Sequence, residues 1–260
     1  MSTNPAAAAA MPEVRSHETV IEIRRPVEEV WKALTDPEAI ARWFAPKVTV
    51  EPGVGGSVAA DWGPGILWKT HIELWEPNAH LRLTETRDHL FTPPGIEQKF
   101  ESRKLVQDYY LEGRGGTTML RLVHSGFGTT AGWDEEYEGT RGGWAGCFLR
   151  MKHSLEEHRN ESVHNRILTR VCAGLDRAEA FRRLDLAAPS DLRREMQRDN
   201  HICGVIPSLN GSVFNASVSK VDAGSVAYLE LLMYGVTDVQ ADAETAKWTS
   251  KLEQLFPAAA

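Results

Sequence analysis

His124 is the residue of this sequence whose type and position best fit a chemical role. The segment 117–125 alternates in the manner of a β-strand, and the alternation places His124 on the same face as Leu120 and Leu122. A histidine on an inward face can donate to a ligand carbonyl, or act as an acid or base near neutral pH. The alternative is a structural histidine whose hydrogen bonds are satisfied at the end of a strand.

Aromatic residues form the second group of interest, because they line apolar binding sites as well as protein cores. Seven of the eight tryptophans lie at or before Trp144, so the two parts of the chain are built differently. Any one of these rings can be ordinary core, but rings that converge on one interior can form an apolar pocket. The predicted ligand-binding residues are Trp43, Trp68, Tyr110, His124, Trp144 and Phe148.

Standard catalytic and metal-binding motifs are absent from the sequence. It has no GxGxxG after a strand, no P-loop and no HExxH, and Val123 replaces the first glycine that a GxSxG elbow around Ser125 requires. His153 and Glu157 are one helical turn apart, but two ligands on a solvated helix end are too few for a metal site. We therefore predict no catalytic residue, no metal and no cofactor, and expect a binding protein rather than an enzyme.

Composition sets the class of protein. The chain has 260 residues, 42% of them hydrophobic, and a net charge of −7, which excludes global disorder and disfavours binding to a nucleic-acid backbone. Cys147, Cys172 and Cys203 form no close pair, which favours a reducing compartment, and we predict the cytoplasm. The most apolar stretch after the N-terminal tail, 226–236, contains Glu230 and is much shorter than the roughly 20 residues of a membrane span.

The spacing of apolar residues predicts the elements that would position these side chains. A strand over 17–24 precedes two short helices, because Pro26 suits a first helical turn and Thr35-Asp36-Pro37 ends one helix and caps the next. Strands are then expected at about 48–51, 57–62, 65–75, 80–86, 99–112 and 117–125, followed by a long helix after Gly132. This order is typical of an α+β unit.

Three glycines stand at the front of the predicted long helix. Gly142, Gly143 and Gly146 would each cost about 1 kcal/mol relative to alanine inside a helix. Either the helix begins later in the sequence, or small residues are needed where the helix and a sheet leave room for a ligand.

The pattern restarts after about residue 161. The segment 167–173 alternates like a first strand, 176–184 is helical, and the last helix carries Trp248, Leu252 and Leu255 on one face. We predict a disordered tail over 1–15, a first domain over 16–160, and a shortened α+β companion over 161–260. The companion can also be interpreted as a degenerate second copy of the first domain that lacks several middle strands.

The string PVEEVWKALTDPEAIARWF, from Pro26 to Phe44, resembles the opening of the START-like (SRPBCC, Bet v 1-like) superfamily. Within that superfamily it is most similar to the family of activator of heat shock protein 90 ATPase homologues. Gly55-Gly56 and the segment 126–144 also resemble that family, and the resemblance covers 16–158. It implies a helix-grip fold, in which a curved antiparallel sheet wraps the last helix and encloses a cavity.

The resemblance implies a binding function for that cavity. We expect a small hydrophobic or aromatic ligand, with no nucleic acid and no membrane as partner. One alternative is a cyclase or hydrolase that uses His124 with a carboxylate such as Asp61 or Glu101. Another is a chaperone-interacting module, although nothing before His17 resembles the chaperone-binding domain of the activators. The sequence leaves the oligomeric state open, a homodimer included.

Overall fold

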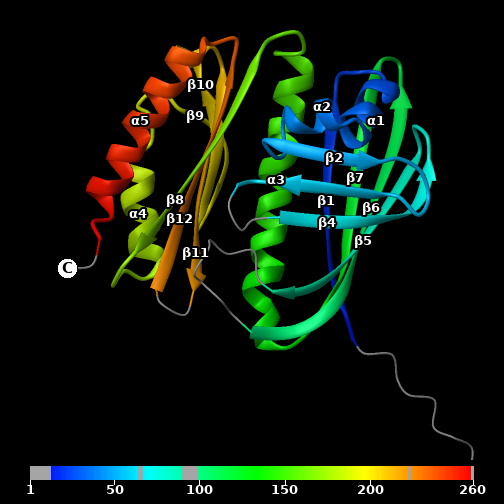
Figure 1. Cartoon of the computed structure of the whole chain (residues 1–260), viewed down its shortest axis with the longest axis horizontal. Coiled ribbons are helices and arrows are strands. Elements are labelled where there is room, and N and C mark those ends of the chain that lie inside the picture. Colours follow the sequence, from blue (N-terminus) through cyan, green and yellow to red (C-terminus); the bar gives the residue numbers. More distant parts are fainter. Residues whose placement is uncertain (1–12, 64–66, 90–98, 222–223, 259–260) are drawn as a thin grey trace, which may run out of the picture.

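Two antiparallel sheets lie on the two sides of a central helix, α3 (Asp134–Glu156) (Figure 1). The computed structural model describes residues 13–63, 67–89, 99–221 and 224–258. Within them, one sheet has seven strands in the order β1-β7-β6-β5-β4-β3-β2, and the other has five in the order β8-β12-β11-β10-β9. The predicted tail over 1–15 lies almost entirely outside the described residues.

The seven-stranded sheet curves around α3, so the expected α+β helix-grip fold is confirmed. Its last two long strands are joined by Gly115 and Gly116, both at positive φ, in the two-residue turn that suits a twisted hairpin. The strands are β1 (Arg15–Ile23), β2 (Lys47–Glu51), β3 (Ser57–Asp61), β4 (Leu67–Glu76), β5 (His80–His89), β6 (Lys99–Arg114) and β7 (Thr117–Phe127).

Helices α1 (Val27–Thr35) and α2 (Pro37–Ala41) connect β1 to β2, as predicted. Asp36 ends the first helix in an extended conformation, and its side chain accepts a hydrogen bond from the Ala39 N–H at 2.9 Å. Just beyond α2, Arg42 donates to the carbonyl oxygens of Glu161 and His158 at 2.9 and 2.6 Å. This arginine therefore ties the first half of the chain to the connection between α3 and the second sheet.

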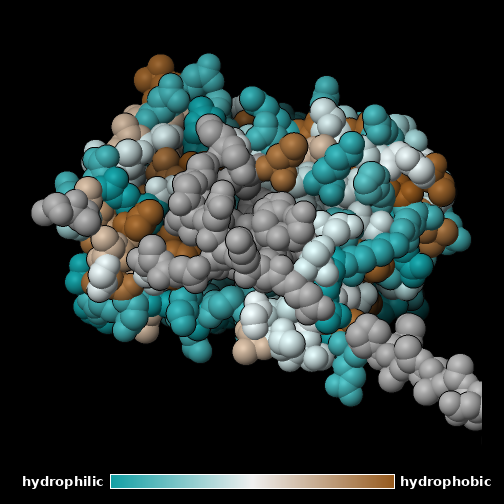
Figure 2. Space-filling model, turned by 60° about the horizontal axis from the view of Figure 1, so that its bottom comes forward, coloured by the Kyte–Doolittle hydropathy of each residue, from teal (hydrophilic) through white to brown (hydrophobic). Residues whose placement is uncertain are grey.

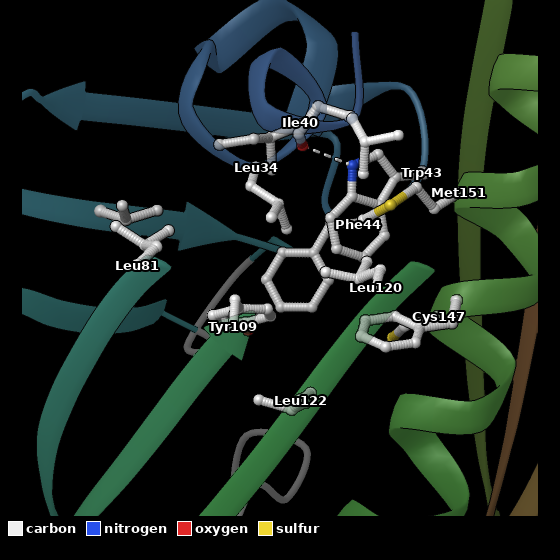
Figure 3. Close-up of a cluster of buried hydrophobic side chains, with 14 of the residues drawn as sticks. Leu34, Ile40, Trp43, Phe44, Leu81, Tyr109, Leu120, Leu122, Cys147 and Met151 are labelled. Carbon is white, nitrogen blue, oxygen red and sulfur yellow. Dashed lines mark hydrogen bonds between the residues drawn. The ribbon is translucent and has the colours of Figure 1, made fainter. Parts of the chain in front are cut away.

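The interior of the first half is filled by side chains from both helices, the sheet and α3 (Figure 3). Phe44 extends from the end of the α2 segment toward Tyr109 on the sheet and Cys147 on α3. Trp43 lies beside it, and its indole N–H donates to the Ala33 carbonyl at 2.9 Å. The first helices are thereby fixed over one end of the sheet.

The second half packs its apolar sheet face away from α3. Helices α4 (Arg177–Leu186) and α5 (Asp238–Leu255) cover that face, and Trp248 contacts Phe214 with ring centres 5.0 Å apart (Figure 1). Short 3-10 turns occur at Ala131–Trp133 and Pro207–Leu209. The strands are β8 (Val163–Cys172), β9 (Arg193–Arg198), β10 (His201–Ile206), β11 (Ser212–Val221) and β12 (Gly224–Tyr234).

The opposite face of the second sheet meets α3. Part of this contact is apolar and includes Cys203, Leu232 and Tyr234 together with Leu149 of α3. One buried cysteine thus lies in each of three separate apolar clusters, because Cys147 belongs to the interior of the first half and Cys172 to the layer beneath α4 and α5.

Two of the glycines of α3, Gly142 and Gly146, face the second sheet at this contact. The helix begins at Asp134, so the interpretation with a later start is wrong. A Cβ at Gly146 would lie 3.0 Å from Asn215 Oδ1, and one at Gly142 would lie 3.4 Å from His201 Nδ1. A Cβ at Gly146 would therefore require Asn215 to shift slightly, whereas one at Gly142 would make an ordinary contact with His201.

The outer surface carries mainly hydrophilic side chains on the face drawn in Figure 2, with scattered hydrophobic residues between them. Among the described helices, none is long and apolar enough to cross a membrane.

Candidate ligand-binding cavity

A cavity of about 300 Å³ lies along one flank of α3, in the angle between the two sheets. Glu136, Thr140, Gly143 and Cys147 line it from the helix, and their spacing of four, three and four residues places them on one side of it. One end of the cavity enters the interior of the first half, and the other end follows the polar part of the second sheet. The cavity is consequently built by both halves of the chain.

Four aromatic side chains surround the end inside the first half. Phe44 stacks on Trp144 with ring centres 5.6 Å apart and an interplanar angle of 10°. Trp62 and Trp68 meet Phe44 edge to face, at 4.8 and 5.4 Å. At these separations the rings contact one another, and together they give this end of the cavity an aromatic wall on which a flat apolar ligand could stack.

His124 and Gln107 provide the polar groups at this end. They are direct partners on β7 and β6, and each is 1% exposed. The Trp144 indole N–H donates to His124 Nδ1 at 3.1 Å. Since an indole N–H can only donate, a neutral His124 must carry its proton on Nε2. The Tyr109 hydroxyl donates to Gln107 Oε1 at 2.9 Å, which orients that amide.

A buried carboxylate holds Trp68 in place. The Trp68 indole N–H donates to Glu85 Oε2 at 2.6 Å, and Glu85 is 6% exposed. Glu85 shares the inward face of β5 with Leu81 and Leu83, so its place on the strand indicates an inward carboxylate. Glu85 was not among the residues predicted from the sequence.

The other end of the cavity is lined by hydroxyl and amide side chains of the second sheet. Ser217 and Ser219 of β11, Tyr228 of β12 and Asn200 before β10 face this space, and all four are half-buried. The sheet therefore presents hydrogen-bonding groups to α3 here, in contrast to the apolar contact nearer Leu149.

A buried polar network joins α3 to the second sheet between these two regions. Arg150 pairs with Glu230 and donates to Cys147 Sγ at 2.9 Å. The Asn215 amide nitrogen donates to Glu230 at 3.3 Å, and its oxygen accepts from His201 Nε2 at 2.7 Å. Each link is specific in direction, because a carboxylate only accepts and a guanidinium only donates.

Burial sets the proton affinities within this network. Burial lowers the pKa of His201 to about 4, against the opposing effect of its hydrogen bond to Asn215. Burial also raises the pKa of the Cys147 thiol, although Arg150 acts in the opposite direction. At neutral pH His201 is therefore uncharged, and Cys147 is a thiol rather than a reactive thiolate.

The structure brings three of the six predicted ligand-binding residues to the cavity. Trp68, His124 and Trp144 line it. Trp43 and Phe148 are buried in the core of the first half and are not among the lining residues, because Trp43 packs on α1 and Phe148 lies one turn further along α3 from Trp144.

The prediction for Tyr110 is wrong. The ring lies on the outer face of the sheet, stacked on His80 at 4.2 Å and covered by the Arg121 guanidinium at 4.2 Å from its centre. Its neighbour Tyr109 points inward instead, because Tyr109 is paired with Leu122 and Tyr110 with Arg121. A strand has only two faces, so the choice of the wrong tyrosine follows from a register error of one residue.

The structure also bears on the two carboxylates suggested as partners of His124. Asp61 accepts a hydrogen bond from the backbone N–H of Gly63 at 2.8 Å and does not line the cavity. The side chain of Glu101 lies outside the described residues. Phe44, Trp62 and Gln107 line the cavity but were not among the predicted residues. Phe44 follows the predicted Trp43, Trp62 ends the predicted strand 57–62, and Gln107 shares the strand parity of Tyr109.

In the described parts of the chain, no group of three or more His, Cys, Asp or Glu side chains could hold a metal ion. His153, considered above as a ligand, instead contacts Glu195 at 2.7 Å.

The chain is similar to several proteins of known structure. No curated protein matches the chain. Protein MLL2253 from Mesorhizobium loti is 28% identical, with 56% of this chain and 100% of that chain covered and a TM-score of 0.43. The AHSA1-like protein RHE_CH02687 from Rhizobium etli is 27% identical, with coverages of 57% and 86% and a TM-score of 0.42.

A third similar structure extends over both halves of the chain. DynU16, described as a protein in the dynemicin biosynthetic locus, is 16% identical, with coverages of 93% and 97% and a TM-score of 0.43. The family described as "Activator of Hsp90 ATPase homolog 1-like protein" matches residues 24–156, just over half of the chain. The protein therefore belongs to this family, within the START-like (SRPBCC) superfamily.

Proposed function

We propose that the protein binds a small hydrophobic or aromatic molecule in the cavity beside α3. The observation that carries this proposal is the group of four rings, Phe44, Trp62, Trp68 and Trp144, around one end of a cavity of about 300 Å³. Burying about 300 Å² of apolar ligand surface contributes at most about 7 kcal/mol before the costs of association. The rings alone thus support micromolar affinity at best, and tighter binding requires polar contacts.

His124 and Gln107 are the proposed polar contacts within the aromatic end. A neutral His124 with its proton on Nε2 is a hydrogen-bond donor, which suits a carbonyl or phenolic oxygen. The Gln107 side chain is fixed through its oxygen by Tyr109, so its amide N–H groups are oriented by a rigid neighbour. We propose a cytoplasmic location for this binding, which the three free cysteines favour.

Binding without catalysis is the better-supported form of the proposal. A general base must offer a lone pair to the substrate, and the Nδ1 lone pair of His124 accepts the Trp144 N–H. Asp61, suggested as its acidic partner, is not a lining residue. The arrangement of His124 thus matches a donor that orients a ligand.

Trp62, directly after β3, and Trp75, in β4, provide a matched test. Trp62 and Trp75 are both half-buried, but only Trp62 lines the cavity, whereas Trp75 packs against Trp31 at 5.2 Å. With 2-naphthol as the probe, calorimetry should show that Trp62→Ala weakens binding about tenfold or more, while Trp75→Ala changes it by less than about twofold. Equal effects of both variants, or no binding of the probe to the wild-type protein, would contradict the proposal.

Native mass spectrometry of protein purified from its own host tests the same proposal without choosing a probe. A retained small molecule that is lost in Trp62→Ala supports it. Recovery of a chaperone in place of a small molecule would instead favour the chaperone-interacting alternative, and turnover of the bound molecule would favour an enzyme.

A further inference from the structure

We infer that the ligand has two parts, an aromatic part held by the four rings and a neutral, hydroxyl-rich part held against β11 and β12 of the second sheet. This inference rests on the proposed binding function and adds the chemical class of the ligand. It starts from the shape of the cavity, which continues from the aromatic end to the second sheet as one space.

Glycines on α3 leave this passage open. A Cβ added at Gly139 or Gly143 would meet no atom within 4 Å, whereas the same atom at Gly142 or Gly146 would contact the second sheet. Gly139 and Gly143 both line the cavity. The helix therefore uses two glycines for close packing and two beside open space, and packing alone does not account for the second pair.

A buried, unsatisfied acceptor independently indicates a ligand group at the polar end. Glu230 is 9% exposed and lines the cavity, and its Oε1 has no hydrogen-bond partner among the described residues. Its other oxygen accepts from Asn215. A buried carboxylate oxygen without a donor is costly, so a ligand hydroxyl that donates to Oε1 would remove that cost.

The surrounding side chains favour a neutral partner over a charged one. Ser217 and Ser219 can each donate and accept, as sugar-like hydroxyl groups do. The ionised groups nearby largely compensate one another: Glu135 pairs with Arg177 at 2.8 Å and Glu230 pairs with Arg150. Glu136 and Lys220 also line the cavity and carry opposite charges. The last charged lining residue, Glu138, forms an ion pair with Arg141.

Other ligand classes fit this end less well. A purely apolar molecule would leave Glu230 Oε1 without a donor. An anionic group would be repelled by Glu230; the Arg150 Nε also lacks a partner in the described part of the chain, but the Arg150 charge is compensated by the Glu230 carboxylate. An aromatic compound that carries a sugar or a similar polyol satisfies both ends.

Three probes with one aromatic part separate these classes: 2-naphthol, 2-naphthyl β-glucoside and 2-naphthyl sulfate. Calorimetry on the full-length protein should show that the glucoside binds about tenfold or more tightly than naphthol, and that the sulfate binds more weakly than the glucoside. If naphthol binds and the glucoside binds no more tightly, this inference is overturned while the proposed binding function stands. If none of the three binds, the proposed function itself fails.

Variants locate the hydroxyl-rich part. The double variant Ser217→Ala and Ser219→Ala should reduce glucoside affinity to about that of naphthol and leave naphthol affinity unchanged. Gly143→Leu should have the same effect by closing the passage, and Gly143→Ala, which fits the open space, is its control. Thermal melts establish that each variant is folded, and the serine pair decides the question if Gly143→Leu does not fold. An unchanged preference for the glucoside in the folded serine variant would overturn the inference.

Discussion

The two sheets present different kinds of side chain to the helix between them. The first sheet directs apolar and aromatic side chains at α3 and receives Trp144 and Phe148 from it. The second sheet directs its apolar face toward α4 and α5, and presents Asn215 and His201 to α3. The helix matches each neighbour, with large residues on the first side and glycines on the second.

This difference shows that the residue choice along a helix between two sheets is explained only by its contacts with both sheets. Gly142 and Gly146 lower helix stability by about 1 kcal/mol each relative to alanine. Gly146 leaves room for Asn215, which donates to Glu230 beside the Arg150–Glu230 pair. Polar groups kept next to an aromatic interior then create a cavity with two chemically distinct ends.

The largest expected effect comes from separating the halves. We predict that 161–260 expressed alone will aggregate or remain partly disordered, because the apolar face that contains Val205, Leu232 and Tyr234 would lose its cover from α3. Residues 12–160 should fold with reduced stability. Circular dichroism melts and amide resonance dispersion measure both. A monomeric 161–260 with a cooperative melt would mean that the two halves are independent domains.

Trp144→Ala should lower the free energy of unfolding by about 3–5 kcal/mol, because a buried indole is removed and the hydrogen bond to His124 is lost. Trp248→Ala in the second half should have a similar cost, since Trp248 is 1% exposed. Urea unfolding gives both values. Only Trp144→Ala should abolish probe binding, so equal loss of binding in both variants would contradict the distinction between the halves.

The buried histidine of the second half predicts a pH dependence of stability. His201 has a pKa of about 4 when folded and an ordinary pKa of 6.5 when unfolded. Between these values the unfolded chain binds a proton that the folded chain does not, so stability falls as the pH is lowered from about 6.5 toward 4.

We expect His201→Gln to remove about 2 kcal/mol of the stability difference between pH 7 and pH 5. His17, whose pKa burial also lowers to about 4, contributes a fall of the same sign that this variant retains. His71→Gln, at an exposed position on β4, controls for the effect of replacing a histidine by glutamine. Urea unfolding at the two pH values is the measurement, and identical pH dependences of wild type and His201→Gln would refute the assignment.

The smallest expected effect distinguishes two glycines of one helix. Gly143→Ala should raise the free energy of unfolding by about 0.5–1 kcal/mol, because its Cβ enters open space and alanine favours the helix. Gly146→Ala should gain less or lose stability, because its Cβ would lie 3.0 Å from Asn215 Oδ1. Equal stabilisation by both substitutions would show that the second sheet does not approach Gly146 this closely.

Much of the first half could be predicted because its signals are local. The Thr35-Asp36-Pro37 boundary and the Gly115-Gly116 turn depend on backbone chemistry within a few residues. The second half was harder. β9 is a charged edge strand without an apolar alternation, and all six residues of β10 are buried, so neither has the period of a half-buried strand.

The cavity could be predicted only in part, because its shape depends on contacts distant in sequence. Trp68, His124 and Trp144 followed from strand parity and helix spacing. Tyr110 was assigned to the wrong face because the Tyr109-Tyr110 pair gives no parity of its own. The contribution of Ser217 could not be foreseen, because no pattern in the sequence shows that β11 turns its polar face toward α3.

The three buried cysteines can report local opening of the structure through their reaction with alkylating reagents. Each thiol lies in a different apolar cluster, and burial raises the pKa of Cys203 to about 12 and that of Cys172 to about 11. Alkylating reagents therefore label a site only when its layer opens and admits water. Quantifying the three labelled peptides over time would order the opening of the ligand-binding interior, the contact between α3 and the second sheet, and the layer beneath α4 and α5, without introducing any mutation.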